Sequence, residues 1–189
     1  MKPKHSQPEP HHDHAVQFYR DDAALLRTLS RFVREGLTAG QPVVIIATPE
    51  HRAALATQLV TDGLPTDYFE RKGALWLLDA RETLALFMDD APGAMPDAKR
   101  FAAAMGDLLE AARRNSDGPA IRAYGEMVDL LWKDGRADAA VRLEVLWNTL
   151  ANTHQFILLC GYSIGSFCKE TAGFDIGDVC RVHAKVLPA

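Results

Sequence analysis

The 189-residue sequence predicts a three-layer α/β protein, in which helices cover both faces of a mainly parallel central sheet. Two observations predict this architecture. Short apolar runs alternate with segments of helical period along most of the chain, as in proteins built from strand–helix–strand units. Several runs, including PVVIIAT at residues 42–48 and FILLCGY at 156–162, are apolar on both sides, which is typical of central parallel strands.

The first expected strand, HAVQFY, shows the alternation of a sheet with two distinct faces. Its successive side chains point in opposite directions, so His14, Val16 and Phe18 share one face and Tyr19 lies on the other. Four further short, mostly apolar segments are expected to form strands. The expected strands are residues 14–19, 42–48, 74–80, 119–127 and 156–162.

Helices are expected where apolar residues recur at helical spacing behind a capping residue. Asp21 or Asp22 caps the first helix, Thr48 the second, and Asp97 a longer helix through Arg114. The segment 177–189 is expected to form a short helix or turn followed by an exit segment. The other expected helices span residues 22–39, 49–63, 81–88, 98–114, 128–135 and 137–153.

Bulk properties restrict the class of protein. Residues 1–13, MKPKHSQPEPHHD, are polar and have no period, so we expect a mobile leader and one domain at 14–189. His11 and His12 fall in this leader, and we expect no role for them. A net charge of −4 argues against direct nucleic-acid binding. The apolar runs are far shorter than the ~20 residues that cross a membrane. Three cysteines without a CxxC pair, and no signal peptide, predict free thiols and a cytoplasmic location.

Seven segments, taken in order, resemble the MEDS sensory domain, a family named for methanogen and methylotroph proteins and the dichloromethane-responsive repressor. Together they span nearly the whole chain from His14 onward. The segments are HAVQFY with RDD, VVIIATPEHR, LLDARETLALFM, RAYGEMVDLLW, LEVLWNTL, FILLCGYS and VCRVHAKVLP.

This resemblance implies a fold related to the ATPase core of RecA and KaiC, and a role in sensing small hydrocarbon derivatives. A P-loop needs a glycine-rich turn, a lysine for the phosphates and a Ser or Thr for magnesium. Here RDDAALL follows the first strand, with two carboxylates that repel phosphate and neither glycine nor lysine. We therefore expect a RecA-like fold without nucleotide chemistry, without a cofactor and without a bound metal ion.

Ligand binding is expected at the carboxyl ends of the parallel strands. Tyr19 ends the first strand with a phenol, although such a ring fills core space equally well. RAYGEM places Arg122, Tyr124 and Glu126 on one face of a strand. An Arg–Glu pair is more often a structural salt bridge. Glu126, however, lies where a related ATPase holds a catalytic carboxylate, and is therefore a candidate ligand acceptor or metal ligand.

Four further candidates complete the expected ligand site. His14 matches the leading histidine of the family, and Cys160 and Tyr162 end the last buried strand at the same expected edge. His183 lies in the last segment that resembles the family. A tethering histidine and an inert buried cysteine are the structural alternatives. A zinc site of His14, Cys160, Cys180 and His183 is a less favoured alternative, because structural zinc usually shows closer paired spacing.

The sequence thus predicts a non-catalytic signal-input domain that binds a small organic ligand and passes the signal to a regulatory partner. A histidine kinase or a transcription regulator is a candidate partner, and oligomer formation is compatible with the sequence. Trp132 and Trp147 are expected to fill the helix-to-sheet interface or to wall an apolar pocket. One alternative is an interaction module for a kinase or a sigma/anti-sigma system without its own ligand, which a side-chain-filled space at the strand ends would favour. Another is a degenerate ATPase or an enzyme that uses Cys160 with a histidine.

Overall fold

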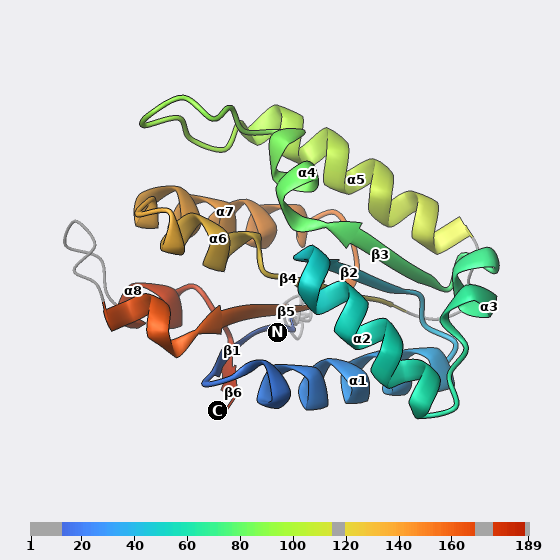
Figure 1. Ribbon diagram of the computed structural model, residues 1–189. Coiled ribbons are helices and arrows are strands. Elements are labelled where there is room, and N and C mark those ends of the chain that lie inside the picture. Colours follow the sequence, from blue (N-terminus) through green and yellow to red (C-terminus); the bar gives the residue numbers. More distant parts are fainter. Residues whose placement is uncertain (1–12, 115–119, 169–175, 188–189) are drawn as a thin grey trace, which may run out of the picture.

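The computed structural model describes residues 13–114, 120–168 and 176–187. Six strands form one sheet in the order β3-β2-β4-β5-β1-β6, and all five neighbouring pairs are parallel. Helices cover both faces of this sheet, with α1 and α2 below it and α4 to α7 above it in Figure 1. The predicted three-layer α/β architecture is confirmed.

The elements follow the alternation seen in the sequence. The strands are β1 His14–Tyr19, β2 Val43–Ala47, β3 Leu75–Asp79, β4 Ile121–Gly125, β5 Phe156–Ser163 and β6 Lys185–Leu187. The helices are α1 Asp22–Thr38, α2 Pro49–Thr61, α3 Thr66–Arg71, α4 Ala80–Ala85, α5 Ala98–Arg114, α6 Met127–Lys133, α7 Ala137–Leu150 and α8 Ile176–Arg181, with the 3-10 helix η1 Ile164–Cys168.

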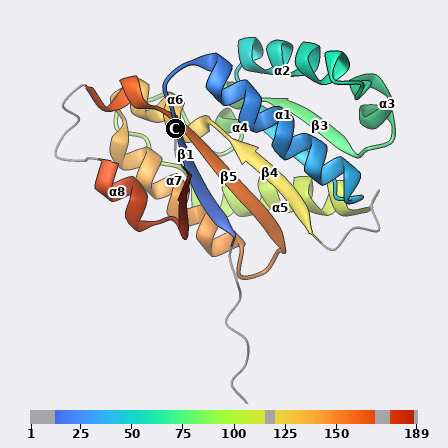
Figure 2. The same cartoon turned by 90° about the horizontal axis from the view of Figure 1, so that it is seen from below.

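The sheet separates two hydrophobic cores. On the α1–α2 side, shown from below in Figure 2, Leu25 and Leu29 of α1 pack with Ile45 of β2 and with Tyr124 of β4. On the opposite side the strands pack against α4 to α8, and both Trp132 and Trp147 are buried there, as expected for residues that fill the helix-to-sheet interface. The alternating side chains of β1 and β5 therefore enter different cores.

Side-chain caps fix where the main helices begin. The Asp21 carboxylate accepts a hydrogen bond from the Ala24 N–H at 2.8 Å, and this pairing satisfies an N–H that the first turn of α1 cannot pair internally. Thr48 caps α2, and Asp97 accepts from the N–H of Arg100 at 2.8 Å at the start of α5. These are the caps that the sequence predicts.

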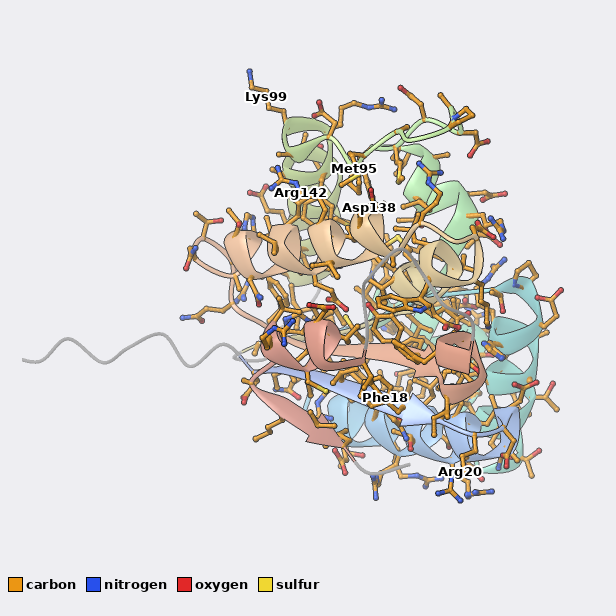
Figure 3. All side chains as sticks on the ribbon, turned by 90° about the vertical axis from the view of Figure 1, so that its left-hand side faces the viewer. Phe18, Arg20, Met95, Lys99, Asp138 and Arg142 are labelled. Atoms are coloured by element: carbon orange, nitrogen blue, oxygen red, sulfur yellow. The ribbon has the colours of Figure 1, made fainter. Side chains whose placement is uncertain are left out.

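Figure 3 shows how completely side chains fill the interior between the sheet and the covering helices. Phe18 lies within this packed region, where its ring contacts those of Tyr162 and Phe167. Arg20, just beyond β1, and Lys99, in the first turn of α5, project from opposite ends of the molecule in this view.

Three elements differ from the prediction, and one of them is the 3-10 helix η1, which was not expected. The expected exit segment contains β6, which pairs with β1 through Lys185–Leu187 and so extends the sheet. The helix α3 was not expected, because TDYFER is too short to show a helical period. Residues 1–12 lie outside the described residues, so the leader and the domain boundary at 14 remain predictions. Among the described residues, no helix is long and apolar enough to span a membrane.

Candidate functional site

The eight residues predicted to bind ligand divide between the two faces of the sheet. Tyr19, Tyr124 and Glu126 lie at the carboxyl ends of β1 and β4, on the side of α1 and α2 or directly beyond the strand. The other main group is on the opposite side, under α7 and α8. It consists of His14, Cys160, Tyr162 and His183. The expectation of one site shared by all eight residues is therefore wrong.

Tyr19, His51, Tyr124, Glu126 and Asp129 form what we call the carboxyl-edge network. Glu126 follows β4 directly and is buried. One Glu126 oxygen accepts a hydrogen bond from the Thr48 N–H. The other oxygen contacts Nδ1 of His51 at 2.7 Å. The Tyr124 hydroxyl also donates to Glu126, at 3.2 Å. This carboxylate consequently joins β4 to the start of α2.

A second buried carboxylate in the network, Asp129 on α6, joins β1 to the end of β5. It accepts a hydrogen bond from the Tyr19 hydroxyl at 3.2 Å, from the Ser163 N–H at 3.1 Å and from the Ser166 hydroxyl at 2.7 Å. Nζ of Lys133, one turn further along α6, lies 2.7 Å from Oδ2 of Asp129, the oxygen that also accepts from Tyr19. The space at the carboxyl ends of β1, β4 and β5 is thus filled by protein groups that satisfy one another.

The acidic surroundings hold the network in defined protonation states. Burial, and after it the Asp129 carboxylate, raises the pKa of Tyr19, so this phenol stays protonated and acts as a donor. The hydrogen bond to Glu126 raises the pKa of His51 against the opposing effect of burial. The other ring nitrogen of His51 lies 3.3 Å from the exposed Asp22 carboxylate. His51 is therefore biased toward the cationic form between two acids.

Arg122 belongs to neither group. It lies near the start of β4, where its guanidinium donates to Gln41 at 2.9 Å and to Glu35 at 2.9 Å and stacks 5.0 Å above the Phe32 ring. The alternative of a structural salt bridge between Arg122 and Glu126 is wrong, because the two residues stand at opposite ends of the strand. Arg122 ties β4 to α1.

His14, Glu144, Cys160 and His183 form what we call the histidine–cysteine cluster. His14 starts β1, Cys160 lies in the middle of β5, and Glu144 projects from α7 onto both. Nε2 of His14 lies 3.3 Å from the Cys160 sulfur and 3.2 Å from a Glu144 oxygen, and the thiol donates to that oxygen at 3.2 Å. His183 Nε2 lies 3.3 Å from the second Glu144 oxygen, which also accepts a hydrogen bond from Tyr162. One carboxylate thus stands at the centre of the cluster.

The cluster does not favour a nucleophilic thiol. Burial, and then the Glu144 carboxylate, raises the pKa of Cys160 well above its usual value. Burial alone would also raise the pKa of Glu144, but the two neighbouring histidines outweigh it and keep this carboxyl ionised. Because a catalytic cysteine needs a lowered pKa and an accessible sulfur, its 3.3 Å contact with His14 does not make Cys160 a protease-like nucleophile.

The residues that sequence reasoning missed are the acids and the histidine that complete each group. Glu144 sits inside an amphipathic helix, and its only signal was its place on the apolar face with Trp147. His51 lies in the first turn of α2, and no pattern in the sequence marked it as a site residue. Cys180, considered for a zinc site with His14, Cys160 and His183, is not a member of the cluster. Glu144 stands in its place.

The turn between β1 and α1 confirms the sequence argument against a phosphate loop. Asp21 uses its own carboxylate to cap α1, and Asp22 extends from the same turn toward His51. A phosphate would have to displace these two negative charges, which it cannot do favourably. The class that the fold and the site define is therefore a RecA-like α/β domain without a phosphate-binding loop.

Comparison with known proteins agrees with this class. A family model described as MEDS, the methanogen/methylotroph, DcmR sensory domain, matches residues 13–184, and the chain belongs to this family. A solved structure of a KaiC-like protein from the hyperthermophilic archaeon Pyrococcus horikoshii OT3 superposes with a TM-score of 0.57 at 11% identity, over 94% of this chain and 73% of that one. At this identity the likeness shows the fold alone. No curated protein matches the chain.

Proposed function

We propose that the chain is a signal-input domain that binds a small, largely apolar organic molecule and passes a conformational change to a signalling partner. Membership of a sensory-domain family supports the input role. The observation that carries the proposal is an apolar hollow of about 340 Å³ between α4 and α5. This volume lies in the range of small-molecule pockets.

The hollow combines apolar walls with a polar rim. Leu78, near the end of β3, and Leu86 beyond α4, which is 57% exposed, are among its apolar lining residues. Asp79 and Glu82 are its acidic lining residues, and in this proposal they lie near a polar substituent of the ligand. The remaining lining residues are Thr83, Ala104, Met105 and Leu108. Such a surface suits a hydrocarbon derivative better than a nucleotide.

A chain of contacts joins the hollow to the carboxyl-edge network. Asp79 caps α4 and also pairs with Arg52 of α2 at 2.9 Å. Arg52 is adjacent to His51, which contacts Glu126 at the start of α6. A ligand that prefers one position of α4 would shift the balance between two states of these contacts. In this proposal the sequence-predicted residues Tyr19, Tyr124 and Glu126 transmit the signal.

The test is a thermal-shift and calorimetric series with one-carbon and halogenated hydrocarbons. Ala104→Phe fills the hollow, and Ala103→Phe, on the exposed side of α5, is the matched control. A ligand at 100 times its Kd stabilises a folded protein by about 2.7 kcal/mol. We expect this response from the wild type and from Ala103→Phe but not from Ala104→Phe.

Two results would contradict the proposal. One is the absence of any response across the series, and the other is an equal response from Ala104→Phe and wild type. Loss of the response in Glu126→Ala together with an intact response in Ala104→Phe would place the ligand at the carboxyl ends of the strands, as the sequence suggested.

A second candidate function is an interaction module without its own ligand. The observation that favours it is the filled space at the strand ends, where Glu126 and Asp129 are both buried and paired within the protein. If this is correct, the chain binds a kinase or a regulatory protein with the same affinity whether or not the hydrocarbon series is present.

A further inference from the structure

The histidine–cysteine cluster carries an inference that does not depend on the proposed ligand. We infer that His14, Glu144, Cys160 and His183 form a site for one divalent transition-metal ion of the zinc type. One ligand atom from each residue lies within 4.8 Å of all the others, and Figure 1 shows that β1, β5 and α7, which carry three of them, are adjacent.

The spacing of the four donors is close to that of a tetrahedral site. Zinc bonds of about 2.0–2.3 Å at the tetrahedral angle separate neighbouring donor atoms by roughly 3.3–3.8 Å. In the cluster Nε2 of His14 lies 3.3 Å from the sulfur of Cys160 and 3.2 Å from Glu144, and Nε2 of His183 lies 3.3 Å from Glu144. His14 and His183 contact different oxygens of Glu144, and the four donor atoms are separated by up to 4.8 Å. Movements of about 1 Å would bring all four into one coordination shell.

Both histidine rings are held in the tautomer that a metal requires. Nδ1 of His183 lies 2.7 Å from the Val179 carbonyl oxygen, which can only accept, so this nitrogen carries the proton. Nδ1 of His14 lies 2.8 Å from Oδ1 of Asn148. The Asn148 amide is oriented in turn by donating to the Val182 carbonyl at 2.9 Å. Nε2 of each ring therefore faces the cluster. The oxygens that accept the hydrogen bond from Nδ1 are of the kinds typical of metal-bound histidines.

One nitrogen in the cluster has no hydrogen-bond partner among the described residues. Nε2 of His183 is fully buried, and its geometry toward the Glu144 carboxylate does not form a hydrogen bond. When the His183 ring is neutral, the lone pair of its Nε2 faces a negatively charged oxygen of Glu144. This arrangement is costly in the protein interior. A cation between His183 and Glu144 would satisfy both groups.

The charges and the donor types indicate which metal. Glu144 and a Cys160 thiolate together carry two negative charges, so a divalent ion forms a neutral buried centre. On binding, the thiol proton that Cys160 donates to Glu144 is released to solvent, and the sulfur bonds to the metal. Two imidazoles, one thiolate and one carboxylate suit Zn²⁺ and not Mg²⁺ or Ca²⁺, which prefer oxygen. Four protein ligands correspond to a structural site and not an open catalytic one.

Cobalt substitution in the metal-stripped protein tests this inference. We expect one Co²⁺ per chain, with the intense d–d bands of tetrahedral cobalt and a thiolate-to-cobalt charge-transfer band, both abolished by equimolar Zn²⁺. The chain has three cysteines, so the double variant Cys168→Ser/Cys180→Ser leaves Cys160 as the only thiol and must keep the band. Cys160→Ser must lose it.

Three further measurements guard the test against misfolding and against adventitious metal binding. X-ray absorption at the zinc edge of wild-type protein should show one sulfur and three lighter ligands, without any substitution. Asn148→Ala, which removes the acceptor behind His14 together with the hydrogen bond to the Val182 carbonyl, should weaken zinc binding roughly 10- to 100-fold and leave the charge-transfer band in place. His11→Ala/His12→Ala should change nothing, because histidines of the leader cannot produce a thiolate band.

The inference is overturned if stripped wild-type protein takes up no cobalt, or if the bound cobalt shows no charge-transfer band. It is also overturned if Cys160→Ser and wild type give the same spectrum. The four groups would then be a metal-free polar cluster in which a protonated His183 pairs with Glu144.

Discussion

The phenol of Tyr124 lies across the backbone of Gly161. A Cβ added at Gly161 would overlap the Tyr124 hydroxyl and would lie 2.9 Å from Cε2 and 3.0 Å from Cζ of that ring. Glycine is therefore required at this point of β5, because it lets the ring of β4 reach over the neighbouring strand toward Glu126. The carboxyl-edge network depends on this close approach.

Gly161→Ala should lower the free energy of unfolding by about 1–3 kcal/mol, since an added methyl group overpacks a filled core. Gly125→Ala is the matched control, because no atom lies within 4 Å of the Cβ that it adds to β4. Urea unfolding followed by circular dichroism measures both. Tyr124→Phe should relieve part of the Gly161→Ala cost in the double variant, and strict additivity of the two effects would contradict the packing explanation.

His51 should make stability depend on pH. Its pKa is raised in the folded protein by the hydrogen bond to Glu126, so its stabilising effect is complete below the unfolded pKa of about 6.5 and is lost as pH rises through the folded pKa. Wild-type stability should thus fall as pH rises above about 6.5. His51→Gln should reduce this slope.

Chemical denaturation at a series of pH values measures this slope. Glu126→Gln, which keeps the shape of the side chain and removes its charge, should reduce the slope as much as His51→Gln does. His154→Gln is the control, since the His154 ring bonds to the Thr153 hydroxyl. An unchanged slope in both His51→Gln and Glu126→Gln would show that the pair does not titrate as the geometry implies.

Asp129 should be among the least replaceable acids of the domain. Its removal in Asp129→Ala leaves the Tyr19 hydroxyl, the Ser166 hydroxyl and the Ser163 N–H without their acceptor inside the protein. A loss of about 3–5 kcal/mol in unfolding free energy is expected. Asp134→Ala, which breaks only the exposed pair with Arg81, should cost less than about 1 kcal/mol. Similar losses from the two variants would contradict the assignment of Asp129 as a buried hub.

The fold was predictable because periodicity and caps are local signals. The strand at residues 14–19 was predicted with its final bounds, and Asp21, Thr48 and Asp97 cap the helices that the sequence assigned to them. β6 was missed for a physical reason. Its three residues, Lys185–Leu187, are a short, partly exposed edge with no alternation to read, and only the pairing with β1 makes them a strand.

The sequence predicted several of the residues of the two groups, but not where the fold places them. Strand alternation correctly separated His14 from Tyr19, yet only the tertiary fold shows that the packing of α7 brings Glu144 to His14 and Cys160. The signal that sequence reading could have used is a glutamate at a position on the apolar face of a helix. A glutamate that is buried there almost always has partners. His51 gave no comparable signal.

Two acidic residues lie in the turn between β1 and α1. Nucleotides should therefore not bind at this turn. Asp21 occupies the Ala24 N–H in the first turn of α1, and Asp22 adds a second negative charge beside His51. A ligand with a Kd of about 100 μM would stabilise the protein by roughly 2.3 kcal/mol at about 5 mM. Thermal unfolding with MgATP or MgADP at that concentration should show no such shift, with Na₂SO₄ of equal ionic strength as the control for salt. A nucleotide-specific stabilisation that is lost in Glu126→Gln would instead reveal a residual RecA-type site at the end of β4, and would revive the degenerate ATPase as an explanation of this domain.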